Sequence, residues 1–178
     1  MDVLLWATVS SVGSPGVLFL LSVVFFAIAE EMERHVTPRK RERWRKASKL
    51  ILLSVMVSMV LSLMLKAVVM HPRPCVPCLW PYSVDCNPYC LADYSFPSGH
   101  AAVAFAVAAA AYASIGRKKY AALFVLPALV GLSRIFLGVH TVWDVLGGAA
   151  LGLVSADVAE LILDYKRRGK AIKQRHRR

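Results

Sequence analysis

The chain has 178 residues, of which 57% are hydrophobic, and its mean hydropathy is +0.53. A soluble domain is usually about 45–50% apolar, so this composition argues against an ordinary soluble fold. A net charge of +11 would fit a nucleic-acid-binding protein, but eight Lys and Arg residues lie in 34–49, three in 116–120 and eight in 166–178. Such clustering is typical of a membrane topology signal, so we expect no nucleic-acid partner.

The first predicted element is a short apolar stretch at residues 2–11. It is too short for an ordinary membrane span, which takes about 20 residues, and "VGSPG" separates it from the next apolar segment. No basic residue precedes its apolar run, so it does not read as a secretory signal peptide. We predict a short interfacial or partly inserted helix, which would place the N-terminus inside if it were an incomplete first crossing.

Five longer apolar segments follow, each long enough, or nearly so, to cross a bilayer as a helix. Helices are expected because every backbone polar group in lipid needs an internal partner. The predicted fold is an all-α integral membrane helical bundle, a single domain over residues 1–178 with five clear transmembrane helices. The N-terminal helix counts as a sixth if it inserts. The five segments are 14–29, 48–70, 100–115, 120–138 and 142–164.

The basic clusters give this bundle an orientation, because cytoplasmic segments carry an excess of Lys and Arg. With the cluster at 34–49 inside, segment 48–70 crosses outward and the loop 71–99 lies outside. The next three segments then place residues 116–120 and a basic tail, about 165–178, inside as well. We therefore predict a multi-pass protein of the cell (plasma) membrane, with the loop 71–99 on the extracytoplasmic side.

All four cysteines lie in that outer loop. An oxidising compartment favours disulfides, and four cysteines allow three connectivities, among which the sequence does not choose. The spacing would also suit zinc, and four free thiols are a further alternative. We favour disulfides because of the predicted compartment. The residues are Cys75, Cys78, Cys86 and Cys90.

Three cations lie outside the basic clusters, at the outer ends of predicted spans: Lys66, Arg73 and Arg134. A single cation there could be an anchor whose charged end reaches the interface. Three are better explained by a shared ligand, because a buried charge costs at least about 2.5–3.5 kcal/mol and like charges repel. An anion with several charges resolves both problems, and phosphate suits both the planar guanidinium and the lysine ammonium.

The tetrapeptide "PSGH", residues 97–100, precedes an apolar run and is predicted to open a helix. A helix N-terminus offers free backbone N–H groups and a dipole that favour an anion. Ser98 can add a hydroxyl donor or act only as an N-cap, and Gly99 allows close approach of the backbone. Alone, this motif more often marks a helix cap than a site.

His140 and Asp144 are spaced to share one face of a helix. A carboxylate can hold an imidazole in one tautomer and leave the other ring nitrogen free to attack. His100 is then available to protonate the leaving oxygen, which gives a route through a phosphohistidine that water hydrolyses. The cations would stabilise the charge on the phosphoryl oxygens, so we expect neither a metal nor another cofactor. Either histidine alone could equally be a satisfied interfacial residue.

Together these residues resemble the type 2 phosphatidic acid phosphatase family, whose pattern is K-x6-R-P, then P-S-G-H, then S-R-x5-H-x3-D. The resemblance covers roughly residues 14–164, but the cysteine-bearing loop is not part of it. It implies a helical membrane bundle, usually of six spans, with His140 as nucleophile, Asp144 as its orienting partner and His100 as general acid. It implies a phosphate cradle of Lys66, Arg73, Ser98, Gly99 and Arg134. The matched positions are Lys66, Arg73, Pro74, Pro97, Ser98, Gly99, His100, Ser133, Arg134, His140 and Asp144.

The expected function is therefore hydrolysis of a lipid phosphomonoester or diphosphate at the outer face of the membrane. Candidate substrates are polyprenyl diphosphate, phosphatidate, phosphatidylglycerophosphate and a lipid-A-like headgroup. The short chain and compact outer loop leave little room for a large soluble substrate, and we favour an isoprenoid carrier diphosphate or a broad specificity that includes it. The same constellation occurs in vanadate-dependent haloperoxidases, which are typically soluble. A non-catalytic protein that binds or transports phospholipids is the other alternative, and the intact pair of histidines with Asp144 argues against it.

Overall fold

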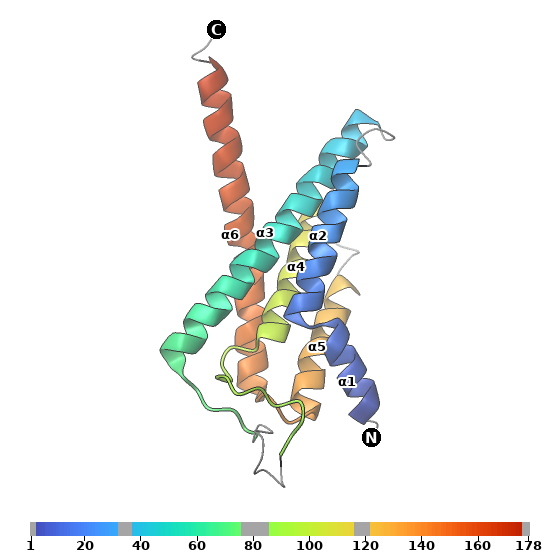
Figure 1. Ribbon diagram of the computed structural model, residues 1–178. Coiled ribbons are helices and arrows are strands. Elements are labelled where there is room, and N and C mark those ends of the chain that lie inside the picture. The colour runs from blue at the N-terminus through green and yellow to red at the C-terminus, as the bar shows by residue number, and fades with distance from the viewer. Residues whose placement is uncertain (1–2, 32–36, 76–85, 116–121, 176–178) are drawn as a thin grey trace.

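The computed structural model describes residues 3–31, 37–75, 86–115 and 122–175 (Figure 1). These ranges contain no β-strand, which confirms the all-α prediction for them. The basic cluster at 116–120, Cys78 and the last three residues of the tail lie outside the described residues. The helices are α1 (Val3–Val12), α2 (Pro15–Glu31), α3 (Pro38–Val69), α4 (Gly99–Ile115), α5 (Val125–Phe136) and α6 (Val142–Arg175).

Helix α4 forms the centre of the bundle, with α3 and α6 packed against it and against each other. Alanine and valine cover most of its surface, and small side chains let neighbouring helices approach closely. Helix α2 packs along α3, while α5 packs on α4 and carries α1 on its other side (Figure 1). The fully buried side chains of α4 include Ala101, Ala102, Val103, Ala106 and Ala110.

The prediction of five clear membrane spans is not confirmed by the described residues. Only α3 and the Val142–Gly169 part of α6 are individually long and apolar enough to cross a bilayer. Helices α1 and α2 pass that test only as a pair, and they are bent by 42° at the short break between them. Helices α4 and α5 are apolar but shorter. The structure thus has the helices of a membrane protein, with fewer full-length spans than the hydropathy pattern predicted.

Helix α1 differs from its prediction in position as well. In Figure 1 the N-terminus lies at the same end of the bundle as the loop after α3, not at the end that carries the basic cluster of α3. Helix α1 also packs on α5 along its length instead of lying apart. Helices α1 and α2, bent at Gly13 and Ser14, together reach the length and apolarity of one span, and α1 begins at the end of the bundle opposite the basic residues of α3.

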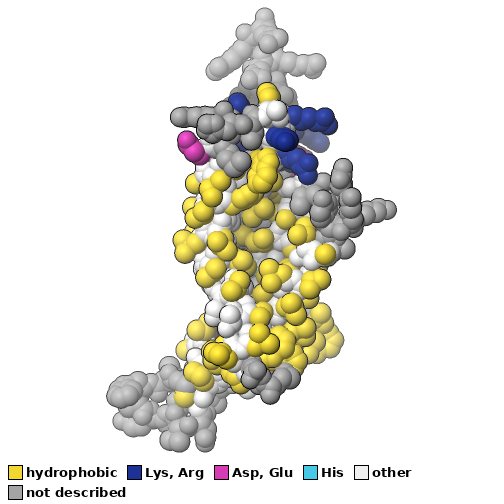
Figure 2. All heavy atoms as spheres, turned by 90° about the vertical axis from the view of Figure 1, so that its right-hand side faces the viewer, with side chains coloured by type: hydrophobic (Ala, Val, Ile, Leu, Met, Phe, Trp, Pro, Cys, Tyr) yellow, Lys and Arg dark blue, Asp and Glu magenta, His cyan; other side chains and the backbone are white. Residues whose placement is uncertain are grey.

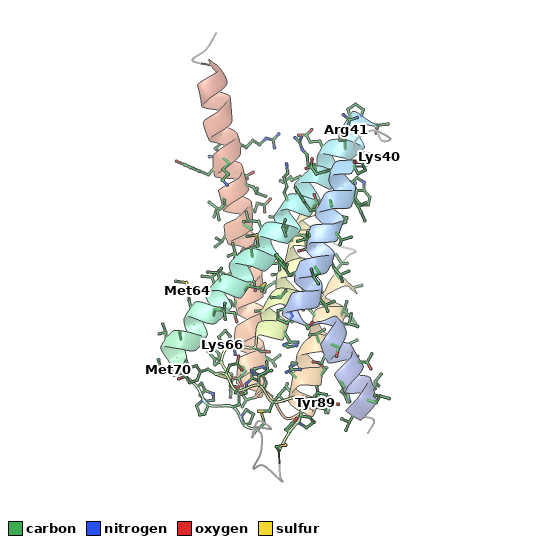
Figure 3. The ribbon with its side chains drawn as sticks, in the orientation of Figure 1. Lys40, Arg41, Met64, Lys66, Met70 and Tyr89 are labelled. Atoms are coloured by element: carbon green, nitrogen blue, oxygen red, sulfur yellow. A yellow bond between two sulfur atoms is a disulfide. The ribbon has the colours of Figure 1, made fainter. Side chains whose placement is uncertain are left out.

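The two ends of the bundle differ in charge. Figure 2 shows a face covered by hydrophobic side chains, with Lys and Arg side chains gathered toward one end. Lys40 and Arg41 lie at that end of α3, while Lys66 and Met70 lie at the other (Figure 3). Helix α6 continues through the predicted tail to Arg175 and projects beyond its neighbours at the basic end (Figure 1).

Glycines on α6 fix how closely this helix meets α4. A Cβ atom at Gly152 would lie 2.3 Å from the Ala102 carbonyl oxygen and 2.8 Å from the Ala106 nitrogen. At Gly148 it would lie 2.5 Å from the Ser98 carbonyl oxygen. Such contacts are too short for any side chain, so the two backbones touch at these positions. The spacing of α4 and α6 therefore depends on the absence of side chains here.

Replacing Gly152 by alanine is expected to lower the stability of the bundle by about 1–3 kcal/mol, because the added methyl group must push α4 away. Thermal unfolding in detergent measures the effect as a lower Tm. Gly169→Ala is the matched control, since no atom lies within 4 Å of a Cβ there and alanine favours a helix over glycine by about 1 kcal/mol. Equal Tm changes for the two variants would contradict the proposed contact.

Candidate active site

The end of α3 places the first two cations. Lys66 lies in the last turn of the helix, and Met70 ends it in a left-handed conformation with φ 49°. The Met70 backbone N–H donates to the Lys66 carbonyl at 3.0 Å. The chain then passes His71, whose carbonyl accepts a 2.7 Å hydrogen bond from the Ser95 N–H, so the segment before Arg73 lies beside the segment before α4.

A disulfide closes the loop between these two segments. Cys75 is bonded to Cys90, with the Cα atoms 6.1 Å apart, and Cys86 is disulfide-bonded as well. The Asn87 side-chain amide donates to the Leu137 carbonyl at 2.7 Å, which joins the loop to the end of α5. The loop is thus fixed both to the segment after α3 and to the turn that leads into α6.

Lys66 and Arg73 share the carboxylate of Asp93. Lys66 Nζ lies 3.0 Å from Oδ2, Arg73 Nε lies 2.8 Å from Oδ1, and Arg73 Nη2 donates to the same Oδ1. Partial burial alone would raise the pKa of Asp93, but the hydrogen bonds and charges of the two cations hold it below its ordinary value. A carboxylate therefore lies between two of the three cations that the sequence singled out.

His140 lies in the turn between α5 and α6 and is only 4% exposed. Arg73 Nη1 lies 3.2 Å from its Nε2 and also donates to the Val139 carbonyl at 3.0 Å. The Nδ1 atom lies 3.2 Å from the Ser95 hydroxyl oxygen. Burial, together with the charges of Arg73 and Arg134, lowers the pKa of His140 below its ordinary value, which favours the neutral imidazole.

Asp144 is fixed at the first turn of α6 and is 1% exposed. Its Oδ2 accepts hydrogen bonds from the Thr141 N–H at 2.7 Å and the Thr141 hydroxyl at 2.8 Å, and the Asp144 N–H donates back to that hydroxyl at 3.2 Å. This is the reciprocal pattern of a capping box. Asp144 Oδ2 lies 3.7 Å from His140 Nδ1, beyond hydrogen-bond distance. His140 and Asp144 are therefore close to each other, as their spacing predicted, but no hydrogen bond joins them directly.

The "PSGH" segment opens α4 at Gly99, where the sequence predicted a helix start. The Ser98 backbone N–H is already used, because it donates to the Asp144 carbonyl at 2.9 Å. The Ser98 hydroxyl is buried, and within the described part of the chain it has no hydrogen-bond partner. The hydrogen bond from the Ser98 N–H to the Asp144 carbonyl joins the start of α4 to the start of α6. It therefore holds Ser98 and His100 next to the turn that carries His140.

Arg134 lies in the last turn of α5 and is 4% exposed. Its Nη1 donates to the Ser10 hydroxyl of α1. Its Nε has no hydrogen-bond partner among the residues that the structure describes. A buried guanidinium with an unused donor is costly unless a ligand satisfies it, which fits the anion-binding role predicted for this residue.

A pocket of about 210 Å³ joins part of this constellation to an apolar wall. Lys66, Arg73, Asp93, His100 and His140 form its polar side. Ser98, Arg134 and Asp144 are buried but are not among its lining residues. The remaining lining comes from α2, α3, the outer loop and α4: Pro15, Met59, Ser62, Leu63, Leu91, Gly99 and Val103.

Three residues that contact the candidate site were not predicted from the sequence. Asp93 is an acidic residue in the loop between α3 and α4. Its negative charge, in a loop next to the cations Lys66 and Arg73, could have indicated that it pairs with them. Ser95 and Ser10 gave no signal, because isolated serines in a loop or an apolar helix have many ordinary roles. Both meet their partners only through tertiary packing, across 45 residues for Ser95 with His140 and 124 for Ser10 with Arg134.

Comparisons with known proteins agree with this architecture. The chain is 43% identical over 72 residues to phosphatidylglycerophosphatase B of Bacillus subtilis, a match covering 35% of this chain and 36% of that protein. It is 38% identical over 71 residues to the putative undecaprenyl-diphosphatase YbjG of Escherichia coli, covering 40% of this chain and 36% of the relative. The matched regions thus span about a third of each curated relative.

Two crystal structures have a similar fold. The transmembrane PAP2-type phosphatidylglycerolphosphate phosphatase of Bacillus subtilis superposes with a TM-score of 0.67 at 26% identity, over 92% of this chain and 77% of that one. LpxE of Aquifex aeolicus superposes with a TM-score of 0.61 at 28% identity, over 88% and 84%. The family model of the PAP2 superfamily matches residues 48–168, which include every residue of the site except Ser10 of α1 and Pro15 of α2. The chain belongs to the PAP2 superfamily.

Proposed function

We propose that this chain is a membrane lipid phosphatase that hydrolyses a phosphomonoester or diphosphate of a lipid. The observation that carries the proposal is the pocket in which Lys66, Arg73, His100 and His140 face an apolar wall. The cations suit a phosphate group, while Leu63 on that wall is 66% exposed on the outside of the bundle. A lipid could therefore place its phosphate in the pocket and leave its chain along α3.

In the proposed mechanism His140 Nε2 attacks phosphorus, and the bond from phosphorus to the leaving oxygen breaks. His100 donates its proton to that oxygen, which leaves a phosphohistidine. Water then attacks phosphorus while His100 takes the proton from it, and the phosphorus–nitrogen bond breaks to release phosphate and restore His140. The two steps return both histidines to their starting states and use no metal or other cofactor.

The proposed phosphate cradle consists of Lys66, Arg73, Ser98, Gly99 and Arg134. Arg73 is already in contact with His140 Nε2, so a phosphate that binds Arg73 is delivered next to the attacking atom. The unused Nε of Arg134 and the unused hydroxyl of Ser98 are further donors beside the pocket. Charge on the equatorial oxygens in the transition state would be stabilised by these donors.

The basic end of the bundle supports a placement in the cell membrane with the site on the extracytoplasmic side. Cytoplasmic ends attract Lys and Arg, and the basic residues of α3 lie at the opposite end from Lys66 (Figure 3). The Cys75–Cys90 disulfide fits an oxidising compartment. We propose a single domain over residues 1–178. Among candidate substrates we favour an isoprenoid diphosphate or a specificity that includes it, alongside phosphatidate and phosphatidylglycerophosphate.

Phosphate release from a panel of purified lipids tests the proposal. The panel contains a prenyl diphosphate, a prenyl monophosphate, phosphatidate and phosphatidylglycerophosphate, each with a chelator, and para-nitrophenyl phosphate as a phosphate ester without a lipid chain. We expect release from at least one lipid, unchanged by the chelator and faster than from the soluble ester. Release from the soluble ester alone would contradict the lipid specificity, and loss of activity with the chelator would contradict the metal-free mechanism.

A further inference from the structure

Ser95 lies between the two residues that the sequence pattern pairs. Its hydroxyl oxygen is 2.6 Å from Asp144 Oδ2 and 3.2 Å from His140 Nδ1. The direct separation between His140 Nδ1 and Asp144 Oδ2 is 3.7 Å, too long for a hydrogen bond. The link between imidazole and carboxylate therefore runs through the serine hydroxyl.

The direction of each hydrogen bond follows from what each group can donate. Asp144 Oδ2 already accepts two hydrogen bonds from Thr141, so it acts as an acceptor toward Ser95 too. The single hydroxyl proton of Ser95 is thus directed to Asp144, and its oxygen is left to accept from His140 Nδ1–H. At the other side of the ring Arg73 Nη1 can only donate, so Nε2 is the acceptor.

Both neighbours of the ring therefore select the same tautomer, with the proton on Nδ1 and the lone pair on Nε2. We propose that Ser95 is a positioning residue that transmits the orienting effect of Asp144 to His140. The inference rests on the proposed role of His140 as the nucleophile. Once Nε2 is bonded to phosphorus the ring is cationic, and the bond from Nδ1–H to the serine oxygen strengthens because the donor is now charged.

The surroundings of Ser95 suit this role. The residue is fully buried, so water does not compete for its hydroxyl. Its backbone N–H is bonded to the His71 carbonyl at 2.7 Å, and the Cys75–Cys90 disulfide joins the segment that follows His71 to the segment that precedes Ser95. Ser95 is not among the residues that line the pocket, so it acts through His140 and not on the substrate.

A matched pair of variants separates the effect of the Ser95 hydroxyl on activity from the effect of side-chain packing. Thr and Val have nearly the same shape, and only Thr keeps a hydroxyl, so Ser95→Thr and Ser95→Val share any cost of the added methyl groups. Ser95→Ala removes the hydroxyl without adding volume. Removing the partner that orients a metal-bound histidine typically costs about 10–100-fold, and we take the same range for the histidine here. We expect a loss of this size in kcat for Ser95→Ala, with KM unchanged, and a clearly higher kcat for Ser95→Thr than for Ser95→Val.

Equal kcat values for the Thr and Val variants, or a Ser95→Ala variant with the wild-type kcat, would overturn the inference. His140→Ala run alongside tests the proposed function itself: if it stays active, the nucleophile assignment fails, whatever Ser95 does. A measurement on the wild-type protein covers the case in which the variants do not fold. Nitrogen-15 NMR of labelled histidine, assigned with His140→Gln, should show the Nδ1–H tautomer at His140, and an Nε2–H tautomer would overturn the link.

Discussion

Replacing His140 by alanine is expected to reduce phosphate release by roughly 10⁴–10⁶-fold, the range seen when the nucleophile of a catalytic triad is removed. The reason is geometric. Nε2 of His140 is the nitrogen that faces Arg73, at 3.2 Å, and the ring lies at the wall of the pocket. Single-turnover phosphate release from the preferred lipid measures the effect, with bound phosphate on the denatured wild-type enzyme as a second readout.

The control for this variant is His71→Ala. His71 lies on the same side of the site, and its Nδ1 is 3.9 Å from Asp144 Oδ1, but its side chain is half exposed and it does not line the pocket. A far smaller loss is expected for this variant. Activity of His140→Ala within about tenfold of the wild type would contradict a histidine nucleophile, because water alone does not reproduce nucleophilic catalysis at this rate.

Replacing Arg73 by alanine should lower kcat by about 10²–10³-fold, the usual cost of removing one donor that stabilises transition-state charge. Arg73 contacts Asp93, the Val139 carbonyl and His140 at once. Its loss would therefore leave the Asp93 carboxylate paired with Lys66 alone and His140 Nε2 without its neighbour. Arg73→Lys should recover part of the activity, because the charge remains while the planar fork is lost. Steady-state kinetics with inhibition by vanadate measures both effects.

Arg167→Ala is the matched control for this change. Arg167 is largely exposed at the basic end of α6, where its Nη2 lies 3.5 Å from Glu42 Oε1, and an exposed pair of this kind contributes little. Activity of this variant should equal that of the wild type. If Arg73→Ala and Arg167→Ala had the same kcat, Arg73 could not belong to the phosphate cradle.

The sequence predicted the helical class and the segments that supply the pocket, because both depend on local patterns. Hydropathy defines apolar helices, and "KAVVMHPRP", "PSGH" and "SRIFLGVHTVWD" each carry their polar residues at a helix end. Helix ends at one side of a bundle must meet, so Lys66, His100 and His140 could be placed together without a structure. Spacing along the chain also places His140 near Asp144, but it does not resolve whether the two side chains are hydrogen-bonded directly or lie 3.7 Å apart, as they do here.

The features that sequence reasoning missed depend on packing between distant segments. The 42° bend between α1 and α2 arises where Gly13 meets the Val130 side chain, and hydropathy contains no information about such contacts. The contact of Arg134 with Ser10 follows from that bend, since it sets α1 against α5. Helix α4 has the bounds that hydropathy predicted, but α5 is shorter than its predicted segment, because an apolar run can continue past the end of a helix into a turn.

Helix α6 is a single helix from Val142 to Arg175, with Asp144 in its first turn and basic residues from Lys166 onward. At about 1.5 Å per residue the rise from Asp144 to Lys166 is about 33 Å, close to the hydrocarbon thickness of a bilayer, about 30 Å. The length of the helix therefore sets the distance between its basic residues and Asp144 across the membrane. Where the basic residues are held at one surface, the depth of the pocket at the other is fixed, and membranes of different thickness would present the headgroup of a bound lipid at different heights relative to His140.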